Sequence, residues 1–336
     1  MVAAAVDAIR ATVESAEAVV AVGASTHAEI GGAVTAAAEV RAPAGIVAFE
    51  PADMTVTVLA GTTFAELDAA LAEQGQECPL DPRDPAATVG GILSTGLSGL
   101  RRLGLGPVRD TLLEVVFVTA AGRYVKGGGP TVKNVTGYDI PRLFVGSLGT
   151  LGVLTRVTLR TRPRPTASIW FSTEIAGANV RTLLFAPTTV ASDGRTTRVC
   201  LEGNAHDIAT QAAAAGLTPG PAPAPPAGEH RGRVSVDPTR LADLESSLRL
   251  IGSVTWLAEY GVGTVHVATG NAGALADVRT TAEDCGGWML RESGAPDLDP
   301  FGAAFPATPL QRRIRTALDP TGKLSPGRVP ATEVAS

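Results

Sequence analysis

Cysteine is scarce in this chain. The 336 residues include three cysteines, Cys78, Cys200 and Cys285, which lie far apart and form no C-x-x-C pair. An odd, dispersed set fits neither a disulfide framework nor an iron–sulfur cluster held by cysteine, so we expect ordinary reduced thiols. This favours a cytoplasmic protein.

Long apolar runs and concentrated positive charge are also missing. No segment is long and apolar enough to cross a bilayer, and the first twenty residues lack the basic start and apolar run of a signal peptide. We therefore expect any association with the inner face of the membrane to occur only through partners. The formal net charge is −5 and the basic residues are scattered, so nucleic acid is not an expected partner.

Closely spaced histidines are absent as well. The four histidines are His27, His206, His230 and His266, and none forms the near pair typical of a metal site, so we predict no metal. His266 lies in an alternating strand-like segment, 264–267, where it is either a buried, hydrogen-bonded core residue or a pocket residue. We favour the structural role, and we assign no catalytic residue.

Glycine is abundant, with 38 residues, and the segment 86–165 carries three glycine-rich turns between β-branched runs. Glycine lets backbone amides approach an anion and adopts dihedrals that other residues avoid. Neither the G-x-G-x-x-G dinucleotide spacing nor the G-x-x-x-x-G-K-[ST] triphosphate spacing occurs. The turns favour a site for a phosphate-bearing ligand of another kind.

Local patterns predict a mixed α and β chain. Thr63 and Glu66 have the spacing of a capping box that opens a helix ending near Gly75, and Asp139 is placed to cap a short helix through Val145. Four further predictions concern strands, namely strands over 45–49 and 54–59, a hairpin of 112–119 with 124–126, and a strand from Val153.

The segment 166–299 has fewer motifs. Its Pro/Ala/Gly tract at 216–226 is typical of an exposed or disordered loop. A helix over 239–250 and a strand over 263–268 are predicted beyond it. We interpret this segment as a smaller α+β domain.

The order of the motifs resembles the FAD-binding subunit of glycolate oxidase, within the p-cresol-methylhydroxylase and vanillyl-alcohol-oxidase type of flavoprotein. The matching segments are VGASTH at 22–27, ATVGG at 87–91 with GLSGLRR at 96–102, KNVTGYD at 133–139, GSLGTLGV at 146–153 and LDPTGKLSPGR at 318–328. The resemblance implies an α+β fold. The resemblance further implies a two-lobed FAD-binding domain over 1–165, a smaller α+β cap domain over 166–299, and a C-terminal segment, 300–336, that returns to the FAD domain.

The resemblance also implies FAD as the cofactor, held at the residues that match the family's motifs. These are Gly23, Ala24, Ser25, Thr26, His27, Thr88, Val89, Gly90, Gly91, Thr95, Gly96, Ser98, Gly99, Arg101, Arg109, Lys133, Asn134, Tyr138, Gly149, Gly152, Val153 and Arg328. Some relatives attach the flavin covalently to a histidine that aligns with Thr26, one position before His27. We therefore expect non-covalent FAD.

Several of these side chains have a second interpretation. Arg101, Arg102 and Arg109 either neutralise phosphate, dock a partner or are simply solvated. The cluster around Lys133, which includes Asn134, Tyr138 and Asp139, either reaches the flavin or holds its own loop by local hydrogen bonds.

In glycolate oxidases of this family a larger flavoprotein subunit bears the substrate site and an iron–sulfur subunit takes electrons onward. The resemblance therefore implies an electron-transferring, FAD-binding oxidoreductase subunit of a glycolate (2-hydroxy-acid) oxidase or dehydrogenase complex. Two alternatives stay open. One is a self-sufficient FAD-dependent dehydrogenase of another alcohol or hydroxy acid. The other is a flavin-free scaffold, since Ala24 and Ser325 depart from the family pattern.

Overall fold

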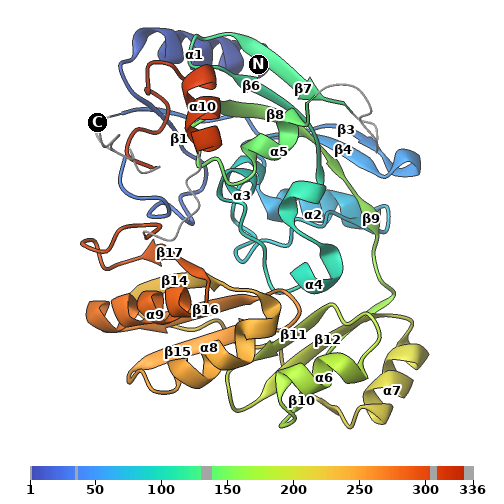
Figure 1. The fold of residues 1–336 in the computed structure, drawn as a ribbon. Helices are drawn as coiled ribbons and strands as arrows, with labels where there is room; N and C mark the ends of the chain where they lie inside the picture. The colour runs from blue at the N-terminus through green and yellow to red at the C-terminus, as the bar shows by residue number, and fades with distance from the viewer. Residues whose placement is uncertain (1, 35–36, 130–137, 303–308, 329–336) are drawn as a thin grey trace.

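The computed structural model describes residues 2–34, 37–129, 138–302 and 309–328 (Figure 1). Two sheets dominate, one of five strands drawn from residues 46–128 and 153–160, and one of eight strands drawn from residues 167–293. In Figure 1 the five-stranded sheet lies in the upper half and the eight-stranded sheet in the lower half. The mixed helix and sheet content is the α+β class expected from the sequence.

The elements of the first part of the chain are α1 (Val2–Ser15), β1 (Val19–Ala21), β2 (Ala38–Val40), β3 (Ile46–Glu50), β4 (Thr55–Leu59), α2 (Phe64–Ala72), β5 (Gln76–Glu77), α3 (Val89–Thr95), α4 (Arg102–Leu105), β6 (Leu112–Val118), β7 (Tyr124–Gly128), α5 (Ile140–Phe144), β8 (Val153–Arg160) and β9 (Arg162–Pro163). The five-stranded sheet has the order β3-β4-β8-β6-β7 with antiparallel neighbours, and β1 and β2 form a small parallel pair.

The two helix caps and the hairpin predicted for this part of the chain are present in the structure. The Thr63 hydroxyl accepts the Glu66 amide while the Glu66 carboxylate accepts the Thr63 amide, which completes the capping box of α2. Asp139 caps α5, and β6 and β7 form the expected antiparallel hairpin. Helix α2 ends at Ala72, three residues before the predicted end.

The elements of the second part are β10 (Ala167–Thr173), α6 (Gly177–Leu183), β11 (Thr189–Ser192), β12 (Thr197–Gly203), α7 (Ala205–Ala214), β13 (Thr218–Pro219), β14 (His230–Ser235), α8 (Leu241–Leu248), β15 (Val254–Glu259), β16 (Thr264–Thr269), α9 (Ala272–Asp284), β17 (Trp288–Ser293) and α10 (Pro309–Leu318). Short 3₁₀ helices occur at Pro51–Asp53, Val108–Asp110 and Pro238–Arg240. The strand order is β13-β10-β12-β11-β15-β16-β14-β17.

One face of the eight-stranded sheet is covered by helices. Val265 and Val267 of β16 belong to the same buried cluster as Leu244 of α8 and Leu275 of α9. Because side chains alternate along a strand, the residues between them point to the other face. That face looks toward the upper half of Figure 1.

The Pro/Ala/Gly tract contributes more than an exposed loop. Its residues Thr218 and Pro219 form β13, which pairs with β10 at the edge of the sheet. Pro223, Pro225 and Pro226 then line a cavity between the two sheets. Most of the tract is exposed and without regular structure, as expected, but it also adds an edge strand and part of a cavity wall.

Residues after α10 lie against the first strand of the chain. The Ser325 amide donates to the Val19 carbonyl at 2.7 Å, and Leu324 is buried with Val13 and Val153. The Asp319 carboxylate accepts the Lys323 and Leu324 amides, which fixes the turn that delivers this segment. The last described residue, Arg328, is thereby held next to the loop that follows β1.

A cluster of five charged side chains joins the two halves. Arg101 contacts Asp81 at 2.9 Å, Glu77 at 3.1 Å and Glu202 of β12 at 3.0 Å. Arg162 contacts Glu77 at 2.6 Å and Glu202 at 2.8 Å. Burial alone would raise the pKa of Glu202, but hydrogen bonds from Arg101 and Arg162 outweigh it and hold the pKa below its ordinary value. Arg101 was predicted to contact the cofactor, and its guanidinium is committed to these carboxylates instead.

Glu202→Gln is expected to lower the free energy of unfolding by about 1–3 kcal/mol, because two partly buried guanidinium groups lose a charged acceptor. A carboxyl with a depressed folded-state pKa stabilises the fold above its unfolded pKa and loses that effect as the pH falls. The difference in the free energy of unfolding between wild type and variant should therefore be largest above pH 4.5, the ordinary carboxyl pKa, and decrease below it. Urea unfolding at several pH values measures this gap. Exposed Glu174→Gln is the control, and a pH-independent gap would contradict the assignment.

Candidate functional site

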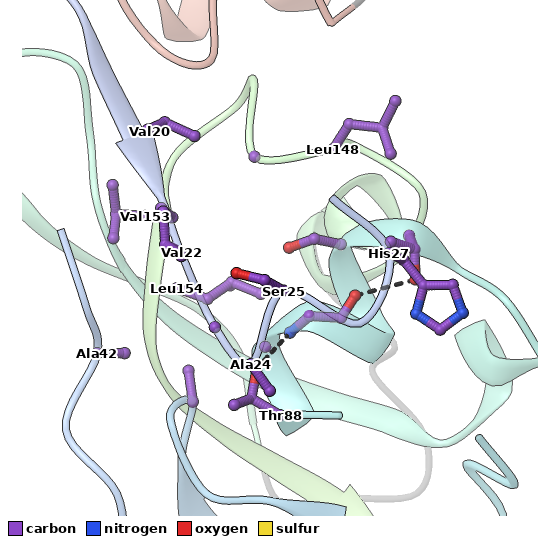
Figure 2. Close-up of a pocket in the computed structure, with 18 of the residues that line it drawn as sticks. Val20, Val22, Ala24, Ser25, His27, Ala42, Thr88, Leu148, Val153 and Leu154 are labelled. Atoms are coloured by element: carbon purple, nitrogen blue, oxygen red, sulfur yellow. Dashed lines mark hydrogen bonds between the residues drawn. The ribbon is translucent and has the colours of Figure 1, made fainter. Parts of the chain in front are cut away.

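A cavity of about 300 Å³ lies beside the loop that follows β1. Figure 2 shows this loop, with Ala24, Ser25 and His27, passing next to Thr88 at the start of α3. Val153 and Leu154 of β8 close another side, and Leu148 and Arg328 also line the space. Four segments that are distant in the sequence therefore meet at one cavity.

The loop 23–29 presents uncommitted backbone amides. Val22 donates its amide to Val40, and the next donated amide is that of Ile30, to the His27 carbonyl. Between them no amide of residues 23–29 donates to another described residue. Ser25 has a φ of 58°, a left-handed conformation that turns successive amides toward one side. Free, convergent amides are the donors that an anionic group requires.

The amides at the start of α3 have internal acceptors. Val89 donates to the Thr62 carbonyl, Gly90 to the Ala60 carbonyl, and Gly91 to the Thr88 hydroxyl. The sequence predicted that this second turn supplies amide donors like the first. The described contacts show another role for this turn: its Thr88 lies very close to the first loop. A Cβ on Gly23 would lie 2.3 Å from Thr88 Oγ1.

The glycine-rich segment before β8 is shaped by packing. A Cβ on Gly152 would lie 2.6 Å from Phe117, so only glycine fits behind the cavity wall. Gly149 has a φ of 77° and faces Ser325, whose own φ is 47°. These residues bring β8 and the C-terminal segment to the same cavity.

Arg328 is the cation of this cavity. Its Nη2 donates to the Ala28 carbonyl at 3.2 Å, while its buried Nε has no partner among the described residues. Burial lowers the pKa of Arg328 from its ordinary value. A buried guanidinium with a free N–H group fits an anionic ligand.

His27 lies between this cavity and a larger one. Thr26 Oγ1 and His27 Nδ1 are 3.0 Å apart. Burial, followed by the nearby charge of Arg83, lowers the pKa of His27 below 6.5. The imidazole is therefore neutral at neutral pH.

The cavity brings together most of the predicted cofactor residues. Those that line it are Gly23, Ala24, Ser25, Thr26, His27, Thr88, Gly90, Gly91, Thr95, Gly149, Gly152, Val153 and Arg328. Sequence reasoning missed other lining residues, among them Val20, Ala42, Gly61, Ser94 and Leu148. Among these five, only Gly61 is a glycine, the residue type that could have signalled a close approach. In the structure a Cβ on Gly61 would lie 2.1 Å from the Ala42 carbonyl.

The other predicted residues lie elsewhere. Val89, Gly96 and Ser98 do not line the cavity. Arg109 is largely exposed and pairs with Asp110, and the Tyr138 side chain is 88% exposed. Lys133 and Asn134 lie outside the described residues. Gly99 and Arg101 line the larger cavity.

The larger cavity, of about 800 Å³, lies between the loop 81–85 and the eight-stranded sheet. Its lining includes Arg83, Trp170, Arg231, His266 and Glu292. It shares residues 25–28 with the first cavity, so the two spaces are neighbours along one loop. Within the described residues, no group of three or more His, Cys, Asp or Glu side chains is arranged to hold a metal ion.

Residues 2–128 match a protein family described as an FAD binding domain. Over 140 residues the chain is 42% identical to glycolate oxidase subunit GlcE of Escherichia coli (strain K12). This match covers 41% of this chain and 40% of that protein. Over 121 residues it is 36% identical to glycolate oxidase subunit GlcD of Bacillus subtilis (strain 168), covering 36% and 26%. D-lactate dehydrogenase of Archaeoglobus fulgidus is 42% identical over 105 residues, covering 31% and 24%. The match thus spans less than half the length of each relative.

The fold extends further than this sequence similarity. A solved structure of alkyldihydroxyacetonephosphate synthase superposes with a TM-score of 0.68 at 15% identity, covering 97% of this chain and 74% of that one. Both halves of the chain therefore share the arrangement seen in that structure. At this identity the likeness concerns the fold alone.

Gly23→Ala is expected to weaken flavin binding by at least about tenfold, since the added Cβ forces the loop away from Thr88. Titration of the flavin-free protein with FAD, followed by quenching of flavin fluorescence, measures the dissociation constant. Gly252→Ala is the matched control, because nothing lies within 4 Å of its Cβ. Equal affinities for the two variants would contradict the role given to the loop.

Proposed function

We propose that this chain, whose residues 2–128 form an FAD-binding domain, binds FAD without a covalent bond and is an oxidoreductase subunit of a glycolate (2-hydroxy-acid) oxidase or dehydrogenase complex. The observation that carries the proposal is the run of free amides over residues 23–29, beside a partly buried cation, Arg328, whose buried Nε has no partner among the described residues. A pyrophosphate needs such donors in one place.

The residues of the first cavity have distinct parts in this proposal. The loop amides and Arg328 hold the pyrophosphate, and Gly23 and Gly152 keep the walls close enough for backbone contact. Thr26 stands where some flavoproteins of this type carry the attaching histidine, which supports non-covalent binding. Bound FAD supplies the acceptor for the two electrons removed from a 2-hydroxy acid.

Partners are part of the proposal. The matching Escherichia coli and Bacillus subtilis proteins are named as subunits of glycolate oxidase, which supports a complex with a larger flavoprotein. An iron–sulfur subunit would take the electrons onward. No helix of the described residues is both long and apolar enough to cross a bilayer, and we propose a cytoplasmic location with any membrane contact made through these partners.

A second candidate is a self-sufficient FAD-dependent dehydrogenase. The specific observation in its favour is the larger cavity, which adjoins the first and carries charged side chains from both halves of the chain. The flavin-free scaffold finds no such support, because it leaves the free amides of residues 23–29 without a ligand.

The visible absorption spectrum of the purified chain tests flavin binding. We expect a flavin spectrum, with about one FAD per chain, that moves entirely to the supernatant after acid precipitation. Flavin retained in the pellet would contradict non-covalent binding. A colourless protein that also fails to take up added FAD would overturn the proposal in favour of the scaffold.

Purification with candidate partners tests the complex. Co-expression with a larger glycolate-oxidase flavoprotein and a cysteine-rich iron–sulfur protein should yield one assembly that transfers electrons from glycolate to an artificial acceptor. Separate elution of all three proteins would contradict the subunit role while leaving FAD binding intact.

A further inference from the structure

The larger cavity contains a histidine–carboxylate pair to which the proposed function gives no role. His266 Nε2 lies 2.7 Å from Glu259 Oε1, and both residues are buried, with 9% and 3% of their surface exposed. A histidine that donates through Nε2 to a carboxylate carries its free lone pair on Nδ1. His266 Nδ1 has no hydrogen-bond partner among the described residues.

Strand register explains this placement. His266 of β16 pairs with Leu257 of β15, and Glu259 follows Leu257 by two residues, so all three point to the sheet face opposite the one that packs against α8 and α9. Leu257 and His266 both line the larger cavity. Glu259 is not among the lining residues and stands behind the imidazole, where a carboxylate orients a histidine.

The carboxylates around the pair have partners of their own. A register shift between β14 and β17 leaves Glu292 unpaired in the ladder, and its carboxylate meets Arg83 Nη1 at 2.7 and 2.8 Å. Asp81 is bound by Arg101, and the Glu29 carboxylate accepts the Gly294 amide. These acids are therefore not available to bind a cation.

Cationic donors remain free in the same cavity. Among the described lining arginines, Arg231 has no carboxylate partner, since its Nε donates to the Ser293 hydroxyl at 2.8 Å. Buried Arg83 Nε and Nη2 have no hydrogen-bond partner either. Beside them on β14, Arg233 makes no ion pair, and burial, with a smaller contribution from Arg83, lowers its pKa to about 10. The unmatched charge favours a small anion, and a carboxylate matches a guanidinium.

We propose that the His266–Glu259 pair is a proton acceptor for a small 2-hydroxy acid bound in this cavity with its carboxylate at Arg231, so that this chain has a substrate site of its own. The proposal rests on the FAD binding argued above and favours the self-sufficient candidate. The hydroxyl O–H bond breaks as its proton passes to His266 Nδ1. Bound FAD would supply the acceptor for the adjacent C–H hydrogen, which would leave with its electron pair as hydride, so that the flavin would be reduced and the substrate oxidised to a 2-oxo acid.

Charged side chains from several elements face His266. Glu259 approaches from β15, Arg233 and Arg231 from β14, Glu292 from β17, and Arg83 from the loop 81–85.

The test is anaerobic reduction of the FAD-loaded chain by glycolate and by D-lactate, followed at the flavin absorption band. We expect one or both to reduce the wild type without partners. His266→Gln should slow this reduction by about 100-fold or more, while oxalate, an unreactive probe for the carboxylate site, binds within about threefold of wild type by calorimetry. Arg231→Gln should weaken oxalate binding by about tenfold or more. Exposed His206→Gln on α7 is the matched control.

A second measurement uses the wild-type chain. In wild-type chain labelled with ¹⁵N-histidine, oxalate should shift an imidazole resonance, and the spectrum of His266→Gln identifies which resonance belongs to His266. Unshifted histidine resonances at saturating oxalate would overturn the proposal.

Failure of this proposal is separable from failure of the proposed function. A chain that holds FAD and is reduced by dithionite, yet by neither hydroxy acid, refutes the proton acceptor and leaves the partner-dependent subunit standing. A chain that holds no FAD but still binds oxalate at Arg231 refutes the proposed function and leaves the anion site. Equal reduction rates for His266→Gln and His206→Gln refute the role of His266.

Discussion

A charged contact between the two halves of the chain centres on Glu202. This single carboxylate of β12 accepts from Arg101 and Arg162, which in turn hold Glu77 and Asp81 of the first half of the chain. Arg101 ends the glycine turn after α3, so the position of that turn is tied directly to the second sheet. Asp81 and Arg101 of this cluster also form part of the wall of the larger cavity.

Sequence reasoning worked best where the cause is local. The Thr63–Glu66 capping box, the Asp139 cap and the β6–β7 hairpin each depend on residues a few positions apart, and the structure contains all three. It was less reliable where the partner is distant. Arg101 was assigned to the cofactor because it lies in a motif that matches the family, and its partner Glu202 is 101 positions away. A single sequence carries no signal for such a pairing.

The two glycine turns of the first cavity resemble each other in sequence and differ in hydrogen bonding. The amides of residues 23–29 are free, whereas those of Val89, Gly90 and Gly91 have acceptors in Thr62, Ala60 and Thr88. This difference depends on β4 and the turn after it, which pass next to α3. The resemblance indicated which segments line the cavity, and only the fold distinguishes the loop that offers donors from the turn that shapes the wall.

His266 shows why strand alternation could not decide between a core and a pocket. Alternation correctly places it opposite the helix-covered face of β16. That face is covered by the other half of the chain instead of solvent, so a polar residue there is buried and also borders a cavity. Burying an imidazole is costly unless a partner satisfies it, and Glu259 does so at one nitrogen only. Because the second nitrogen has no partner among the described residues, only a ligand or water can offset the free-energy cost of burying it. A role in binding or proton transfer explains such a histidine better than packing does.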